Sequence, residues 1–272
     1  MPPSELPVAI REPVQAFDYQ RGAAGPMDER AIAVEAPIEI AFGGASYAVM
    51  MATPDDLEDF VTGFAITEGI VERIEDIRAL ETKRAGGGLR VDVALTGERL
   101  SQHFARSRAM AGRTGCGLCG IEDLAHLPKP RGPVPASAPI APRAIRAALE
   151  GLERAQPLNA ETRAVHGAAW SDREGRVLFV REDVGRHNAL DKLIGALVRG
   201  GADPTSGFIV LTSRCSFEMV AKAAAFGAGT LVSVSAPTSL ALERAREAGV
   251  TISAIARADR ATIFGGAQGG VA

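Results

Sequence analysis

The feature that most constrains the fold is the alternation of apolar runs and helical patterns in the C-terminal half of the chain. The apolar runs lie at residues 177–180, 208–211, 231–234 and 250–255. Between them apolar residues recur at helical spacing, as Leu190, Leu193 and Leu197 do. Strands that are apolar on both faces and alternate with helices predict an α/β protein with a mostly parallel sheet covered on both sides. In such sheets ligands bind beyond the carboxyl ends of the strands.

The preceding part of the chain has the pattern of a smaller α+β unit built on hairpins. Residues 32–52 alternate around a Gly-Gly pair at 43–44, and a second hairpin is predicted across the glycines at 86–88. A helix is expected between the two hairpins, capped by Thr53 and stopped at Gly69.

Proline content suggests where the chain divides. Residues 1–30 hold five prolines and no sustained periodicity, so we expect an arm with at most one short strand. Residues 128–142 hold six prolines, which exclude a regular helix or a central strand and favour a linker. The predicted units are therefore a flexible arm at 1–30, an α+β part at 31–127, a linker at 128–142, an α/β core at 143–264 and a Gly-rich tail at 265–272.

Composition excludes several classes of protein. Thirty Lys and Arg residues against thirty-three Asp and Glu residues give a net charge of −3, and 46% of the residues are hydrophobic. A disordered chain would have fewer hydrophobic residues or a larger net charge. The chain also lacks the overall positive charge that is typical of proteins that bind nucleic acid. No stretch approaches the ~18 apolar residues of a membrane helix, and the N-terminal residues lack the pattern of a secretory signal. We therefore expect a cytoplasmic protein whose three cysteines stay reduced.

The most distinctive local motif is the segment at 115–120, in which three glycines surround Cys116 and Cys119. Glycine exposes the sulfurs and frees the backbone, and Arg113 favours a thiolate at Cys116. The motif suits a cysteine that passes a group between partners. Two other interpretations remain: small buried cysteines beside a turn, or a zinc site with His126 at a spacing that matches no common finger. A thioredoxin-like pair is disfavoured, because no helix is apparent at Cys116 within a βαβ unit.

Polar groups follow the apolar strands, where a ligand crevice is expected. The segment at 181–188 is unusually dense in charged residues, which favours a functional or interface role. Its His187 is suited to moving protons near neutrality. His166 lies in a predicted strand and is equally well explained as a core histidine.

Two further turns are candidates for binding an anion. Between a strand and a helix, Ser213, Arg214 and Ser216 are the better contacts. Cys215 in the same turn is either an activated thiol or, the favoured interpretation, a small residue in a tight turn. After the last strand, Arg257 and Arg260 with small residues between them suit a phosphate or pyrophosphate.

Several segments together resemble the formate dehydrogenase accessory sulfurtransferase (FdhD) family. The most specific matches are the segments at 181–192, 216–222 and 232–240. The cysteine motif and the segments at 53–57 and 67–70 also match, so the resemblance spans about residues 45 to 264. It implies a layered α/β/α fold similar to that of cytidine deaminases, and association as a homodimer.

The resemblance also implies a function. Members are cytoplasmic carriers that take sulfur from a cysteine desulfurase as a persulfide. They pass it to the molybdenum or tungsten bis-guanine-dinucleotide cofactor, which then enters formate dehydrogenase. Cys116 matches the persulfide-forming position, and Cys119 matches the second cysteine. The stretch that matches the cofactor-binding segment comprises Ile255, Ala256, Arg257, Ala258, Asp259 and Arg260.

Departures from the related patterns limit what the fold implies. The zinc-binding residues of deaminases are missing after His166 and before Cys116, so deaminase chemistry does not follow and no structural metal is expected. The alternative function is a non-catalytic chaperone that holds the cofactor for formate dehydrogenase. Replacing Cys116 by alanine separates the two, because a chaperone keeps its activity and a sulfur carrier loses it.

Overall fold

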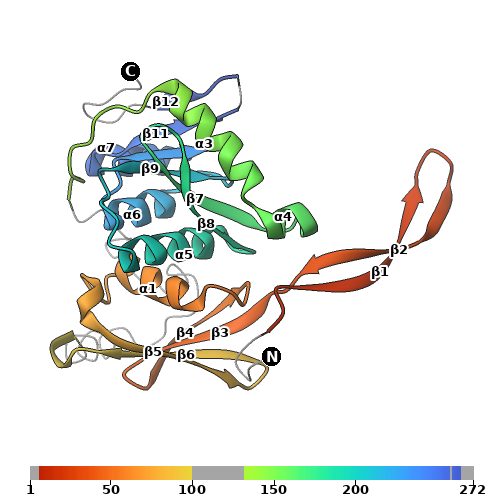
Figure 1. Ribbon diagram of the computed structural model, residues 1–272, viewed down its shortest axis with the longest axis horizontal. Helices are drawn as coiled ribbons and strands as arrows, with labels where there is room; N and C mark the ends of the chain where they lie inside the picture. Colours follow the sequence, from red (N-terminus) through yellow and green to blue (C-terminus); the bar gives the residue numbers. More distant parts are fainter. Residues whose placement is uncertain (1–5, 100–131, 258, 265–272) are drawn as a thin grey trace.

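The computed structural model (Figure 1) describes residues 6–99, 132–257 and 259–264. Its strands form a two-stranded, a four-stranded and a six-stranded sheet. The four-stranded sheet belongs to the α+β part predicted from the hairpins, and the six-stranded sheet belongs to the predicted α/β core. None of the described helices is both long and apolar enough to cross a membrane.

The first two strands form a long hairpin that extends away from the rest of the molecule (Figure 1). β1 (Ala9–Asp18) pairs antiparallel with β2 (Ala23–Ala33). The expectation of at most one short strand before residue 30 is therefore wrong, and the predicted boundary falls inside β2. Pro13 and Pro26 are tolerated because both strands of an isolated ribbon are edges. Solvent reaches both faces, so the segment shows no alternation.

The four-stranded sheet has the order β4-β3-β6-β5 and carries one helix on a face. Its elements are β3 (Ala36–Phe42), β4 (Ala45–Ala52), α1 (Leu57–Thr67), the short 3-10 helix η1 (Ile74–Asp76), β5 (Ile77–Ala85) and β6 (Gly88–Leu95). Both predicted hairpins are confirmed, with turns at 43–44 and 86–87. Gly43 and Gly44 both have positive φ, which a tight hairpin turn requires.

The start of α1 differs from the prediction. The helix begins at Leu57 with Asp56 as its N-cap, so Thr53 does not cap it. Thr53 instead contacts the distant turn after β8, where its Oγ1 accepts from the Val184 backbone N–H over 3.1 Å. The helix ends at Thr67, close to the predicted stop.

The six-stranded sheet forms the core, in the order β12-β11-β10-β9-β7-β8. Its strands are β7 (His166–Asp172), β8 (Val177–Asp183), β9 (Gly207–Leu211), β10 (Thr230–Ser233), β11 (Thr251–Ala254) and β12 (Thr262–Phe264). β9, β10 and β11 pair in parallel, and β7 and β12 run antiparallel to their neighbours, so the sheet predicted as mostly parallel is mixed. β8 therefore runs in the same direction as the parallel trio, and their carboxyl ends share one edge.

Helices cover both faces of this sheet, as the apolar strands predicted (Figure 1). α5 (Arg186–Arg199), α6 (Phe217–Phe226) and α7 (Ser239–Ala248) pack on one face in a single apolar cluster. α3 (Pro142–Arg154) packs on the other face, and the short α4 (Pro157–Thr162) follows it. The described linker residues, 132–141, form no helix or strand.

The two parts meet where α1 crosses α5. A Cβ built on Gly63 would lie 1.8 Å from the Asp191 carbonyl oxygen, and one built on Gly195 would lie 1.8 Å from the Asp59 carbonyl oxygen. The helix backbones are therefore in direct contact, and any side chain at either glycine would push them apart. This junction fixes the α+β part against the core.

Candidate functional site

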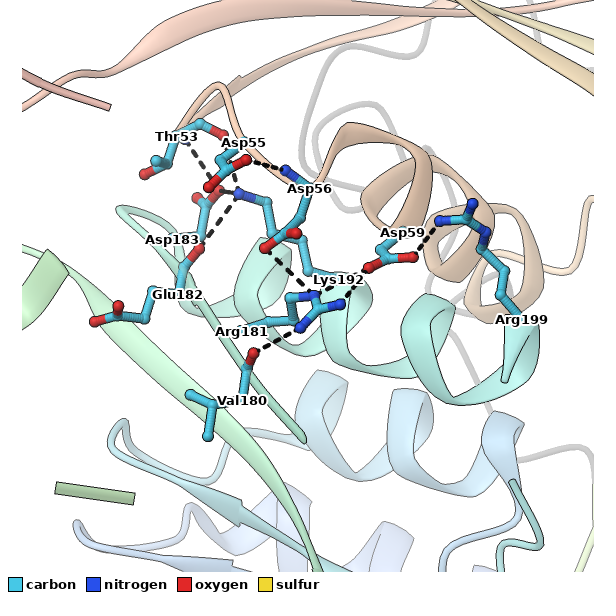
Figure 2. A network of polar contacts seen from close by, with 10 residues as sticks. All are labelled: Thr53, Asp55, Asp56, Asp59, Val180, Arg181, Glu182, Asp183, Lys192 and Arg199. Atoms are coloured by element: carbon cyan, nitrogen blue, oxygen red, sulfur yellow. Dashed lines mark hydrogen bonds and ion pairs between the residues drawn. The ribbon is translucent and has the colours of Figure 1, made fainter. Parts of the chain in front are cut away.

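Most of the polar segment at 181–192 holds the two parts of the molecule together. Asp183 and Lys192 form an ion pair of 2.8 Å whose side chains are 0% exposed. Lys192 Nζ also donates to the Thr53 carbonyl over 2.9 Å, and Asp183 accepts from the Thr53 N–H over 3.0 Å (Figure 2). Asn188 Nδ2 donates to Asp183 and to the Met51 carbonyl. These contacts join the end of β4 to the turn between β8 and α5.

A second network crosses the same junction around the buried carboxylate of Asp59. Arg181 Nη2 lies 2.7 Å from Asp59 Oδ2, and Arg199 Nη1 lies 2.5 Å from Asp59 Oδ1. Arg181 also pairs with Asp56, the N-cap of α1 (Figure 2). Burial, more than any charge nearby, raises the pKa of Asp56. Arginines from β8 and α5 thus hold the start of α1.

A third network involves the segment at 216–222. Lys222 Nζ from α6 lies 2.9 Å from Asp191 Oδ2 on α5 and 2.9 Å from Thr67 Oγ1 on α1. Burial alone would lower the pKa of Lys222, but the charges of Asp191 and Glu68 raise it above its ordinary value. The amine stays charged inside the protein.

The first two networks show that the interface role favoured for the segment at 181–188 is an internal one, between the two parts of the molecule. From that segment only Arg186 and His187 remain for contact with a ligand.

The carboxyl edge of the parallel strands brings two of the predicted binding segments together. Ser233, at the end of β10, donates from Oγ to the Ser213 carbonyl over 2.7 Å. The Ser233 carbonyl in turn accepts from the Ala256 N–H over 3.1 Å. The turn after β9 and the stretch after β11 are therefore neighbours across the end of β10.

The stretch after β11 begins with a strained residue. Ile255 has a φ of 52°, a left-handed conformation that β-branched residues rarely adopt, at a cost of about 1–3 kcal/mol. Its N–H donates to the Ser235 carbonyl over 3.2 Å, and its side chain is 41% exposed. Such strain persists where the surroundings impose it, and it concentrates at functional sites.

Arginine side chains line this edge. Arg257 Nη1 donates to the Val234 and Ala256 carbonyls, and the Arg257 N–H donates to the Arg260 carbonyl over 2.7 Å, which closes a turn. Arg257, Arg260 and Arg214 are all exposed. Asp259 is exposed in the same turn, and Ala258 lies outside the described residues. The edge thus offers guanidinium groups to an anion.

The turn between β9 and α6 has two hydroxyls that are engaged locally. Ser213 Oγ donates to the Arg214 carbonyl, and Ser216 Oγ donates to Glu218. Cys215 is fully buried, and burial raises the pKa of its thiol to about 12. The interpretation of Cys215 as a small residue in a tight turn is confirmed, and an activated thiol there is excluded.

The cysteine motif cannot be placed against this edge, because Cys116, Cys119, Arg113 and His126 all lie outside the described residues. The exposed-loop and zinc interpretations of that segment therefore stay predictions. Within residues 6–99, 132–257 and 259–264, no three His, Cys, Asp or Glu side chains are grouped so as to hold a metal ion.

One contact between polar side chains is not predicted by the sequence analysis. His187, in the first turn of α5, lies with Nε2 3.1 Å from Glu218 Oε2, in the first turn of α6. His166, at the start of β7, lies near them, and burial followed by the charge of Arg186 lowers the pKa of His166. The sequence indicates this contact only through the placement of the two residues. Each lies in the first turn of a helix, and the strands that precede these helices end at the same edge of the sheet.

The fold and this edge define a two-part α/β protein with a polar, arginine-bearing edge at the carboxyl ends of parallel strands. A profile of the FdhD/NarQ family matches residues 33–269, and the chain belongs to that family. The sulfur carrier protein FdhD of Bordetella petrii is 46% identical, over 89% of this chain and 87% of the relative. That of Variovorax paradoxus is 44% identical, over 95% and 90%.

A solved structure has the same architecture. The crystal structure of a protein from Desulfotalea psychrophila, provisionally named a formate dehydrogenase accessory protein, superposes with a TM-score of 0.74. Its sequence is 26% identical to this chain, and the alignment covers 96% of this chain and 99% of that one. The resemblance inferred from the motifs is thus confirmed in sequence and in fold.

Proposed function

We propose that this chain is a sulfur carrier for formate dehydrogenase. In this proposal it accepts sulfur from a cysteine desulfurase as a persulfide on Cys116. It then delivers the sulfur to the molybdenum or tungsten bis-guanine-dinucleotide cofactor, in the cytoplasm, before that cofactor enters the dehydrogenase. The observation that carries the proposal is the 46% identity, over nearly nine-tenths of the chain, to a protein named a sulfur carrier. The two cysteines at 115–120 supply the thiol chemistry that such a role needs.

The transfer uses ordinary thiol and persulfide chemistry. The Cys116 thiolate attacks the outer sulfur of the desulfurase persulfide, and the desulfurase cysteine leaves as a thiolate. Cys119 then attacks the inner sulfur of the new persulfide. A disulfide forms between Cys116 and Cys119, and the outer sulfur leaves as hydrosulfide for the metal. A cellular dithiol returns the pair to its reduced form.

The acceptor would bind at the carboxyl edge of the parallel strands. A cofactor with two guanine dinucleotides carries two diphosphate groups, and arginines and helix starts are the usual partners of such anions. Arg257, Arg260 and Arg214 are exposed there, beside the turn at 213–216 that leads into α6. Two-fold association of the chain would place two such edges together, which suits a cofactor with two similar halves.

Intact-mass spectrometry tests the first step. The protein is incubated with a cysteine desulfurase and cysteine, and we expect a thiol-labile gain of about 32 Da that Cys116→Ala abolishes. Cys119→Ala is the matched control, because it removes a thiol from the same motif and should retain the adduct. Formate dehydrogenase activity in cells that express Cys116→Ala should also be lost. Retained activity would favour the chaperone, and an adduct on another residue would refute the assignment.

Nucleotide titration tests the acceptor site. Arg257→Ala combined with Arg260→Ala should weaken binding of guanosine diphosphate at least tenfold. Arg246→Ala removes an exposed arginine from the last turn of α7, away from the edge, and should leave binding unchanged. If the unmodified chain, the double variant and Arg246→Ala all bind guanosine diphosphate equally well, the proposed acceptor site is wrong.

A further inference from the structure

Four polar side chains meet where α5 and α6 begin. They are Arg186, His187, Ser216 and Glu218, which we call the helix-start cluster. Glu218 Oε2 accepts from His187 Nε2 and from Ser216 Oγ, each over 3.1 Å. Burial alone would raise the pKa of Glu218, but these bonds and the charge of Arg186 lower it below its ordinary value. Glu218 is therefore an ionised carboxylate held in a fixed position.

Some polar atoms of the helix-start cluster make no hydrogen bond within the described residues, whereas the polar atoms of the Asp183–Lys192 pair are all bonded. Every polar atom of the Asp183 and Lys192 side chains is engaged. In contrast, Arg186 Nε is buried without a partner among the described residues, which is costly for a donor. Glu218 uses only Oε2 in contacts with the part of the chain that the structure describes. The side chains of His187 and Glu218 are 30% and 18% exposed, so a ligand can reach them.

The chemistry of the cluster selects one kind of ligand group. A phosphate suits the guanidinium of Arg186 but is repelled by the carboxylate of Glu218. A planar base that offers N–H donors and also acceptors satisfies both side chains. Guanine has this pattern, with N–H groups on N1 and N2 for a carboxylate and acceptors at O6 and N7 for an arginine. Adenine carries an acceptor at N1 where guanine carries a donor, so the carboxylate would disfavour it.

The position of the cluster fits the remaining parts of a nucleotide. α6 follows β9, and Arg257 follows β11, two places along the sheet. Neighbouring strands lie about 4.8 Å apart, so the two sites are separated by about 10 Å along the edge. A ribose diphosphate spans such a distance. A base at the cluster would thus place its diphosphate beside the Ser213 turn and Arg257.

We infer that Glu218 and Arg186 recognise the guanine base of the nucleotide that binds at the carboxyl edge, with His187 and Ser216 as positioning residues for the Glu218 carboxylate. The inference rests on the proposed function for the identity of the ligand. It adds the residues that read the base and the direction in which the nucleotide lies.

Calorimetric titration of the intact chain with three nucleotides tests this inference. Inosine diphosphate lacks only the 2-amino group of guanosine diphosphate, and adenosine diphosphate reverses the pattern at N1. We expect guanosine diphosphate to bind at least tenfold more tightly than inosine diphosphate, the worth of one hydrogen bond to a carboxylate. Adenosine diphosphate should bind more weakly still. Glu218→Gln should weaken guanosine diphosphate at least tenfold and bring its affinity close to that of inosine diphosphate.

Glu243→Gln is the matched control, because it neutralises an exposed carboxylate on α7 and should change neither affinity. Equal binding of guanosine and inosine diphosphates to the unmodified chain would overturn the inference, as would unchanged guanosine diphosphate affinity in Glu218→Gln. The persulfide on Cys116 needs no nucleotide, so its formation would still support the sulfur carrier after either result. Base discrimination without a persulfide would refute the carrier and leave the inference standing.

Discussion

Replacing Gly63 by alanine probes the junction that positions the candidate site. The new Cβ would lie 1.8 Å from the Asp191 carbonyl oxygen and 2.8 Å from the Gly195 nitrogen, both backbone atoms. Non-bonded carbon contacts settle near about 3.5 Å, so α1 and α5 must separate by roughly 1.7 Å. Neither atom can rotate away. The separation also strains the Asp59–Arg181 ion pair and the bond from Lys222 to Thr67, which span the same junction.

The sign of the change in unfolding free energy distinguishes a glycine in a tight helix contact from a glycine in an exposed helix. In an exposed helix, glycine to alanine stabilises by about 1 kcal/mol. Here, overpacking alone costs about 1–3 kcal/mol, and disturbing a buried ion pair costs several more. We expect Gly63→Ala to lower the free energy of unfolding by at least about 3 kcal/mol, a large share of the ~5–15 kcal/mol typical of a domain.

Urea unfolding measures this difference. Trp170 is the only tryptophan and is buried, so its fluorescence reports on the core, and far-UV circular dichroism reports on the whole chain. Gly87→Ala is the control, because a Cβ there meets nothing within 4 Å. It should stay within about 0.5 kcal/mol of the unmodified protein. A Gly63→Ala variant as stable as the unmodified chain, or more stable, would refute the direct backbone contact.

Three further predictions concern single groups that are buried or half-buried. Lys192→Met leaves Asp183 charged and unpaired in the interior, so it should cost about 3–5 kcal/mol in the same assay, and an unchanged midpoint would contradict the network. Cys215, whose thiol has a pKa of about 12, should resist iodoacetamide at about pH 8 in the folded protein and react after unfolding; rapid labelling of the native state would contradict its burial. His166 should titrate below 6.5 by NMR, because burial and Arg186 lower its pKa. Protonation then favours the unfolded chain, so the contribution of His166 is complete above pH 6.5 and is lost as the pH falls toward the folded pKa. A folded pKa at or above 6.5 would refute this.

Local chemistry was sufficient to predict much of the fold. Gly43, Gly44 and Gly86 specify the two hairpin turns through positive φ values that other residues avoid. The apolar runs of β9, β10 and β11 are buried on both faces, so their composition alone indicates a covered parallel sheet. These elements depend on contacts that the sequence pattern encodes directly.

Features that depend on distant partners were not predictable in the same way. Thr53 has the composition of a helix cap, but its backbone and hydroxyl contact Asp183 and Val184, about 130 positions later. The β1–β2 hairpin lacks alternation because most of its residues are exposed on both faces. The density of charged residues at 181–192 indicates a special role, but that role is an internal junction, and the pairing of His187 with Glu218 depends on how two helices are placed.

The most direct test of the account follows sulfur from donor to acceptor. The reduced chain, loaded by a cysteine desulfurase with isotope-labelled cysteine, is separated from the donor and mixed with the bis-guanine-dinucleotide cofactor. We expect label to appear first on Cys116 and then on the metal of the cofactor, and an apo formate dehydrogenase to become active on receiving that cofactor. Label that never enters the chain, or a Cys116→Ala chain that delivers it equally well, would contradict the account.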